Sequence, residues 1–334
     1  MPKLSPAQVA GLNGMCPNAS AAQLGSLLDS SAFGGFGNVY YLDPTNGSDG
    51  YNGLSKTSAF KTLPAAYAAL TAGQNDVLVY IAGTSSISLS AAFTWAKNYT
   101  HFIGASAPVV VANRSRIFQA AAATGLTSLF TISATGCIFS NLMIFQGVAD
   151  ATSLVSVNIT GNRCYFENVH FAGIGEATQD TAGAASLQLT GAYECVFRNC
   201  AIGLDTVSGG ANSTELSVTS NSHRNHFDKC MFYRYISHAS HALVTVAAGG
   251  IDRWLRFTDC LFYTDSVNRG VSLTSVFSIP AGISQGKILL DANCRMITDG
   301  STGTGDWDSN NRAMVWNAAV APAAAAAGGI MTKQ

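Results

Sequence analysis

Charged residues are scarce in this chain. Asp, Glu, Lys and Arg make up only 11% of its 334 residues, and the formal net charge is −1. Amphipathic helices cover their solvent face with Lys, Glu and Arg, so a mainly helical fold is not indicated. A nearly neutral chain also has no general electrostatic attraction to nucleic acid or to an anionic membrane surface. We therefore expect no nucleic acid and no membrane among its partners.

Long apolar runs are absent as well. No window approaches the roughly 20 apolar residues that are needed to cross a bilayer. The N-terminus begins MPKLSP and contains no apolar run of signal-peptide length. We therefore expect the chain to be made in the cytoplasm of its host. Because 48% of its residues are hydrophobic, it can still bury a large core.

An internal repeat organises the middle of the sequence. Five segments align without gaps, and each carries a phenylalanine at the same place: Phe139, Phe166, Phe197, Phe227 and Phe257. The spacings between them are 27, 31, 30 and 30 residues, which indicates one supersecondary unit per repeat. Within each segment apolar and polar residues alternate, which is the period of a strand. The repeat therefore predicts a parallel β-solenoid with one coil per unit.

The alternation breaks once in each repeat, two residues after the phenylalanine. A polar residue stands where an inward-facing apolar one is expected, at Asn141, Asn168, Asn199, Lys229 and Asp259. Asn and Asp tolerate left-handed backbone and hydrogen-bond to their own neighbours. The pattern predicts a tight bend between two strands of every coil.

Six of the eight cysteines occupy two positions of the repeat. They are Cys137, Cys164 and Cys195 at the first position, and Cys200, Cys230 and Cys260 at the second. We expect each set to stack inside the solenoid about one strand spacing apart, ~4.8 Å. Such residues behave as small buried hydrophobes, and reduced thiols suit a protein that folds in the cytoplasm.

The segment upstream of the repeat resembles the opening of pectate-lyase-like right-handed β-helix proteins. Residues 39–55 read VYYLDPTNGSDGYNGLS and lead into FKTLPAAYAAL at 60–70. In that group, a strand, an Asp/Asn/Gly loop and a short helix of this kind cap the first coil. DVLVYIAG at 76–83 and YTHFIGA at 99–105 also resemble its early coils.

The resemblance implies an all-β, right-handed parallel β-helix over roughly residues 39–298. We expect an N-terminal arm at 1–38 with a short helix near 20–28. A first strand, loop and capping helix follow at 39–75, coils at 76–298 and an extended C-terminal tail at 299–334. This fold hosts many activities, so the resemblance says little about function.

No residues stand out as catalytic. Enzymes of the pectate-lyase-like group act with carboxylates and basic residues on the outside of adjacent coils. At that place the sequence has Glu167, Arg198 and Asp228, which alternate in sign and predict an ion-pair ladder. A glycosidase needs two carboxyl groups flanking a sugar site. Glu176 is near Asp180 in the sequence and Asp252 is near Asp259, but a chain with 19 acidic residues contains such neighbours by accident.

Metal and cofactor sites are not predicted either. Four of the six histidines are His223, His226, His238 and His241. In a strand, a spacing of three does not place two rings on one face, and no HExxH motif accompanies them. We favour a polar loop or a subunit contact for this cluster. Asp43 and Asp49 could hold Ca²⁺, but a cap turn is the favoured interpretation.

The outer face of the second strand of each coil is unusually apolar. Its large residues are Met143, Phe145, Met231, Tyr233, Leu261 and Tyr263. A soluble monomer rarely exposes such a stripe, and methionine and aromatic residues are enriched at buried contact centres. We predict that this face is an interface of a homo-oligomer. A parallel trimer is the common arrangement of viral β-helices.

These features together favour a structural protein of a bacteriophage virion. The preferred hypothesis is a trimeric decoration or cement protein of the capsid, whose arms contact the major capsid protein or another virion protein. The alternative is a tailspike or a pectate-lyase-like polysaccharide-degrading enzyme. A spike usually carries a separate particle-binding domain, and this chain has room only for a short arm.

Overall fold

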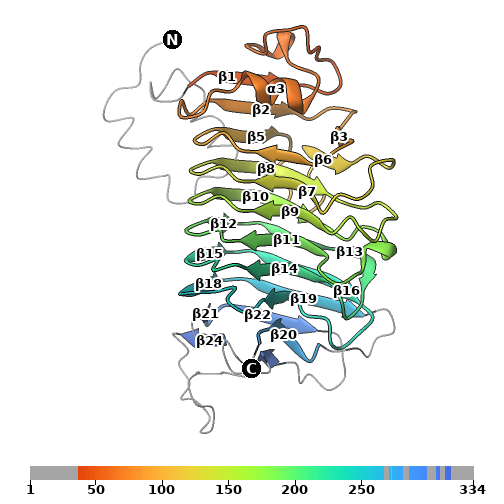
Figure 1. The fold of residues 1–334 in the computed structure, drawn as a ribbon, viewed down its shortest axis with the longest axis vertical. Coiled ribbons are helices and arrows are strands. Elements are labelled where there is room, and N and C mark those ends of the chain that lie inside the picture. Colours follow the sequence, from red (N-terminus) through yellow and green to blue (C-terminus); the bar gives the residue numbers. More distant parts are fainter. Residues whose placement is uncertain are drawn as a thin grey trace, which may run out of the picture.

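The computed structural model describes residues 37–266, 271, 273–280, 286–298, 306–308 and 313–316. They form an all-β, right-handed parallel β-helix, which confirms the predicted fold class (Figure 1). The helix expected near residues 20–28, and all of the expected arm before Gly37, lie outside the described residues. No helix in the described ranges is both long and apolar enough to cross a membrane.

The first coil is closed by a short helical segment, as the sequence predicts. The strand β1 (Val39–Leu42) is followed by the 3₁₀ helix η2 (Lys56–Ser58) and the helix α3 (Leu63–Ala69). The side chain of Thr62 accepts a hydrogen bond from the backbone N–H of Ala65, and Pro64 lies in the first turn. Both features favour a helix start. Leu63 and Ala66 are buried, so α3 covers the end of the core.

Two sheets form the walls of the solenoid, and all of their pairings are parallel. Sheet A has sixteen strands and sheet B has eight among the described residues. The first leg of sheet A contains β1, β2 (Val77–Ile81), β5 (His101–Ala105), β8 (Ile138–Phe145), β10 (Tyr165–Ala172), β12 (Val196–Arg198), β15 (Asn225–Asp228), β18 (Trp254–Thr258), β21 (Lys287–Asp291) and β24 (Ala313–Trp316).

The second leg of sheet A turns away from the first leg at a corner. It contains β3 (Ile87–Leu89), β6 (Arg116–Gln119), the last residues of β8 and β10, then β13 (Ala201–Gly209), β16 (Met231–Ile236), β19 (Leu261–Ser266) and β22 (Arg295–Thr298). Sheet B contains β4 (Phe93–Trp95), β7 (Ser128–Ile132), β9 (Val155–Ile159), β11 (Ala185–Thr190), β14 (Thr214–Thr219), β17 (Val244–Val246), β20 (Ser275–Ser278) and β23 (Asp306–Asp308). A second 3₁₀ turn, η3 (Ala177–Gln179), precedes β11.

The register between coils is the one that the repeat predicts. Each of the five aligned phenylalanines pairs with the next one along the axis. Their rings stack with centroid distances of 5.3, 4.7, 4.4 and 5.2 Å and interplanar angles of at most 12°. All five are buried, so the column lies inside the solenoid. Aromatic stacking and apolar burial therefore act along the same column.

The corner between the two legs also forms where it is predicted. Asn141, Asn168, Asn199, Lys229 and Asp259 all have positive φ, between 51° and 56°. At two successive corners the side-chain amide of Asn168 donates a hydrogen bond of 2.8 Å to Oδ1 of Asn141. The left-handed residue turns the chain in each coil, and the inward apolar series then resumes.

The cysteines are buried and free, as predicted. The six repeat cysteines and Cys294 are reduced and at most 9% exposed. In the second set, the thiols of Cys200, Cys230 and Cys260 each lie 3.4–3.6 Å from the carbonyl oxygen of the phenylalanine one coil earlier. Burial raises the pKa of the Cys230 thiol well above its ordinary value.

The solenoid continues beyond residue 298, which is a correction to the expected tail. The strands β23 and β24 add to sheet B and to the first leg of sheet A. Trp307 is 8% exposed, and its ring lies 5.6 Å from that of Phe262. A buried tryptophan between strands belongs to the core, so part of the segment assigned to the tail forms a further coil. The rest of the expected tail lies outside the described residues.

Candidate functional site

The six residues of the predicted interface lie on the second leg of sheet A and pair from coil to coil. Four of them are half-buried: Phe145, Met231, Leu261 and Tyr263. The other two, Met143 and Tyr233, are only 5% and 3% exposed. The expectation that all six face solvent is therefore wrong for Met143 and Tyr233, which are buried within the chain itself.

A loop at residues 106–115 reaches this face at His170. The backbone N–H of Ala112 donates to Nδ1 of His170 at 3.1 Å. Because Nδ1 accepts, the proton lies on Nε2, which donates to the carbonyl oxygen of Gly203 at 2.9 Å. The hydroxyl of Tyr233 lies 3.0 Å from the same nitrogen. Burial lowers the pKa of His170 to about 4, so this ring is a neutral structural group at pH 7.

Toward the C-terminal coils, the same face stays partly open to solvent. Leu261 pairs with Met231, and Tyr263 pairs with Ile297 on the next coil. Ile297 is 50% exposed, and the other three are half-buried. We call these four residues the apolar strip. On the loop 106–115, Val109, Val110 and Val111 are also 38–45% exposed, which is uncommon for three consecutive valines.

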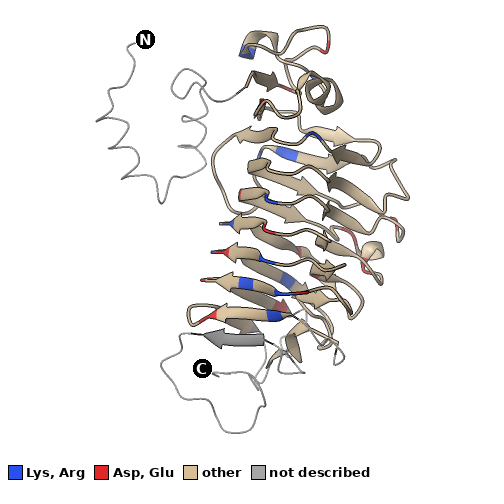
Figure 2. Ribbon diagram, turned by 60° about the vertical axis from the view of Figure 1, so that its left-hand side comes forward, with Lys and Arg blue, Asp and Glu red and all other residues tan. Residues whose placement is uncertain are grey.

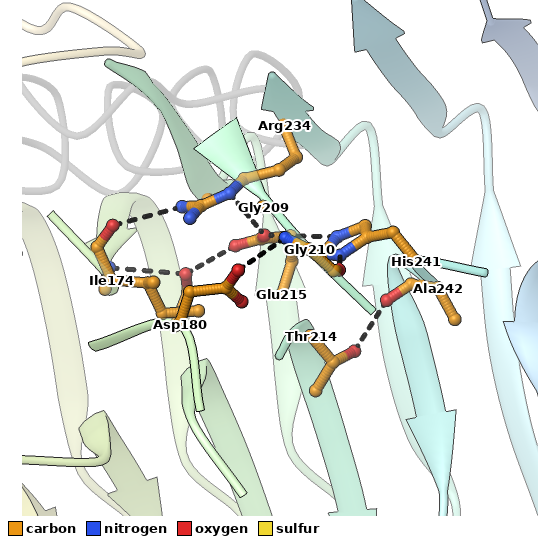
Figure 3. A network of polar contacts seen from close by, with 12 residues as sticks. Ile174, Asp180, Gly209, Gly210, Thr214, Glu215, Arg234, His241 and Ala242 are labelled. Atoms are coloured by element: carbon orange, nitrogen blue, oxygen red, sulfur yellow. Dashed lines mark hydrogen bonds and ion pairs between the residues drawn. The ribbon is translucent and has the colours of Figure 1, made fainter. Parts of the chain in front are cut away.

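A buried polar cluster lies between the second leg of sheet A and sheet B (Figure 3). The side chains of Glu215, Arg234 and His241 are completely buried. Oε1 of Glu215 lies 3.5 Å from Nε of Arg234 and 3.6 Å from Nε2 of His241. Ser186 donates a hydrogen bond of 2.6 Å to Oε2 of the same carboxylate. A buried carboxylate requires such partners, because it has lost its hydration.

The cluster anchors the connections between the two sheets. Nδ1 of His241 lies 2.8 Å from the carbonyl oxygen of Gly210, and Arg234 donates to the carbonyl oxygen of Ile174 at 3.2 Å. The N–H of Gly210 donates to Asp180 at 2.6 Å. A Cβ at Gly209 would lie 2.7 Å from Nε of Arg234, so the backbone approaches the cluster too closely for a side chain.

Sequence reasoning missed this cluster. The available signal was a single carboxylate in β14 and a single guanidinium in β16, each among neutral neighbours. The alternation assigns Glu215 to the outside of its strand, where a charge needs no explanation. Only the path of the connections 210–213 and 237–243 shows that the position is enclosed.

A pocket of about 210 Å³ lies beside this cluster. The connections that precede β11, β14 and β17 form its walls, and the outer face of sheet B forms its floor. The lining residues are Gly183, Ala184, Ala211, Asn212, Ser213, Thr214, Ser217, Ser240, Ala242, Thr245 and Ser278. None of these residues is ionisable, so the described lining supplies no general acid or base. Its polar groups are hydroxyls, one side-chain amide and backbone.

The other residues that the sequence singles out as possible catalytic or metal-binding groups make structural contacts. Arg198 forms an ion pair of 3.4 Å with Asp228, one step of the predicted ladder. Burial raises the pKa of the Glu167 carboxyl, the third member. Asp49 accepts hydrogen bonds from the backbone of Lys61 and Thr62. Asp43 likewise accepts from Thr45 and Asn46, so both aspartates shape the cap turn as predicted.

The four clustered histidines have separate surroundings. His223 stacks on Tyr193 with ring centroids 5.3 Å apart, and His226 lies 2.9 Å from the hydroxyl of Thr258. His241 belongs to the buried cluster, and His238 accepts from the N–H of Ser240. Within the described ranges no three His, Cys, Asp or Glu side chains are grouped so that they could hold a metal ion.

Charge is thinly spread over the outside of the solenoid (Figure 2). The described ion pairs with exposed partners are few and local, such as Arg163 with Glu194 at 2.7 Å. Pairs of this kind contribute about 0–1 kcal/mol each.

Comparison with known proteins gives structural neighbours only. No family model matches the chain, and no curated protein matches it. Pectin methylesterase PemA from Erwinia chrysanthemi is 16% identical with a TM-score of 0.49, over 86% of this chain and 91% of that one. Pectate lyase Pel9A is 13% identical with a TM-score of 0.47, over 82% and 81%. ORF18 of Geobacillus virus E2 is 12% identical with a TM-score of 0.43, over 94% and 65%. At these values we draw no functional argument from them.

Proposed function

We propose that this chain is a structural protein of a bacteriophage particle. It associates with copies of itself, as a trimer, through the outer face of the second leg of sheet A. Its role is that of a decoration or cement protein, which binds the major capsid protein or another virion protein. The observation that carries the proposal is the apolar strip, which crosses consecutive coils and stays partly open to solvent.

The geometry of the strip suits association along the solenoid. Parallel strands stacked ~4.8 Å apart make a flat side that repeats from coil to coil. A second copy in parallel orientation presents the same side chains at the same spacing, so residues near a threefold axis parallel to the solenoid would meet their own copies. Met231 and Tyr263 are of residue types that are enriched at the centres of such contacts.

The alternative remains a tailspike or pectate-lyase-like polysaccharide-degrading enzyme. Hydrolysis or elimination on a glycan requires ionisable groups at the bound sugar. The lining of the 210 Å³ pocket has none among the described residues, and the carboxylate of Glu215 behind it is completely buried. The apolar strip therefore supports assembly more directly than any described group supports catalysis.

The oligomeric state tests the proposal. Met231→Asp together with Leu261→Asp places two charges within the contact, and each added charge would need costly desolvation. In light scattering, we expect the wild type to be a trimer and the double variant to be a monomer. The circular dichroism spectrum of the double variant should be unchanged, because each solenoid stays folded. Thr131→Asp with Gln188→Asp, on half-buried positions of sheet B, is the matched control and should stay trimeric. A monomeric wild type, or a double variant that still assembles fully, would contradict the proposal.

A further inference from the structure

The pocket beside the buried cluster has walls that are held in place. Thr214 donates from Oγ1 to the carbonyl oxygen of Ala242 at 2.9 Å, which ties the floor to the next connection. Asp180 and His241 hold Gly210 from two sides (Figure 3). Preorganised walls keep the cavity open without a ligand, and this reduces the entropic cost of binding.

One polar atom in the lining lacks a partner. The hydroxyl of Ser213 is buried and makes no hydrogen bond within the described part of the chain. The residue as a whole is 4% exposed and belongs to the pocket lining. Buried hydroxyls are normally paired, so this unpaired hydroxyl is available to a group that binds in the cavity.

The chemistry of the lining selects the class of that group. Hydroxyls both donate and accept hydrogen bonds, and so does the side chain of Asn212 through its two ends. No charge is present in the described lining to prefer an ion. The volume of about 210 Å³ equals several water molecules at ~30 Å³ each, which leaves room for a single sugar ring.

Neutral polar residues continue from the pocket along sheet B. Successive coils present Thr131, Asn158, Gln188, Ser217, Thr245 and Ser278 in register on its outer face. The last three also line the pocket. At ~4.8 Å per coil, this column offers hydrogen-bonding groups at short regular intervals beyond the pocket.

We propose that this pocket binds one ring of a neutral saccharide, and that the rest of the glycan lies along the polar column of sheet B. The site is on a different sheet from the apolar strip, so it is independent of the proposed oligomer. It binds without cleaving, because the described lining contains no group that transfers a proton.

Saturation-transfer NMR with simple sugars tests the proposal. The probes are the methyl glycosides of glucose, galactose, mannose and N-acetylglucosamine, with the methyl glycoside of galacturonic acid as the charged comparison. We expect millimolar binding of at least one neutral glycoside and weaker binding of the charged one. Ser213→Ala removes no hydrogen bond of the free protein, so the fold should persist while affinity falls roughly 2- to 12-fold.

A blocking variant and its control locate the site. Thr245→Trp fills the pocket from its floor and should abolish the transfer signal. Thr131→Trp makes the same change on the same column four coils away, outside the pocket, and should leave binding unchanged. The proposal is overturned if no neutral glycoside binds, if the charged one binds as well as the best neutral one, or if binding survives Thr245→Trp.

Discussion

Replacement of Phe197 by alanine tests the interior of the solenoid at its most regular point. Phe197 is completely buried, and its ring stacks between those of Phe166 at 4.7 Å and Phe227 at 4.4 Å. Removing a buried phenylalanine costs about 3–5 kcal/mol in transfer free energy and cavity formation. Stacked pairs contribute about 0.5–1.5 kcal/mol each beyond the buried area. Two pairs are lost, so we expect a cost in the upper half of that range.

The assay is equilibrium unfolding in urea followed by circular dichroism, with the slope of the transition checked for a change. Phe197→Leu keeps most of the volume and should cost less than half as much. Tyr51→Ala is the control, because Tyr51 is 49% exposed and should change stability by no more than about 0.5 kcal/mol. A loss below about 1 kcal/mol for Phe197→Ala would refute the inward column and its register.

Three further predictions follow from buried groups. In thiol titration of the native protein, the seven buried cysteines should not react until the chain unfolds; Cys16 lies outside the described residues. Rapid reaction of several thiols, or a link between Cys137 and Cys164, would contradict their placement. His170 should remain neutral down to about pH 4, whereas the unfolded chain takes up this proton near ~6.5. Stability from this group is thus complete above about pH 6.5 and falls by about 3 kcal/mol between pH 6.5 and 4. An NMR titration of His170 with a midpoint near ~6.5 would disprove this. Glu215→Ala leaves the guanidinium of Arg234 buried without its carboxylate and should destabilise the protein by about 3–5 kcal/mol. The double variant Glu215→Ala with Arg234→Met should recover much of this loss. Thermal melts in which the single variant matches the wild type would exclude the ion pair.

The coils could be predicted because each carries its own local pattern. A phenylalanine and a polar bend residue two positions later mark register and corner in each of the five repeats, and in three of them a cysteine stands two residues before the phenylalanine. Left-handed backbone at Asn141 and Asn168 is a preference of asparagine itself, and at Lys229 the aligned position predicted it. Local information of this kind survives into the structure because the strands of each coil pair only with strands of the adjacent coils.

The features that the sequence could not predict depend on connections between coils. The loop 106–115 has no repeat pattern, yet Ala112 binds His170, which lies 58 residues away in the chain. Alternation therefore correctly placed Met143 and Tyr233 on the outer side of their strands but could not show that they are covered. The burial of Glu215 and the pocket were missed for the same reason: the walls of the pocket beside Glu215 come from three separate connections.

The proposed role in a phage particle is tested most directly by counting this chain in the particle. Particles of the phage that encodes it would be purified and analysed by quantitative mass spectrometry against the major capsid protein. A decoration or cement protein that assembles as a trimer predicts a copy number in the hundreds and a multiple of three. Absence of the chain from purified particles would contradict the structural role, and a handful of copies would contradict a position on the capsid shell.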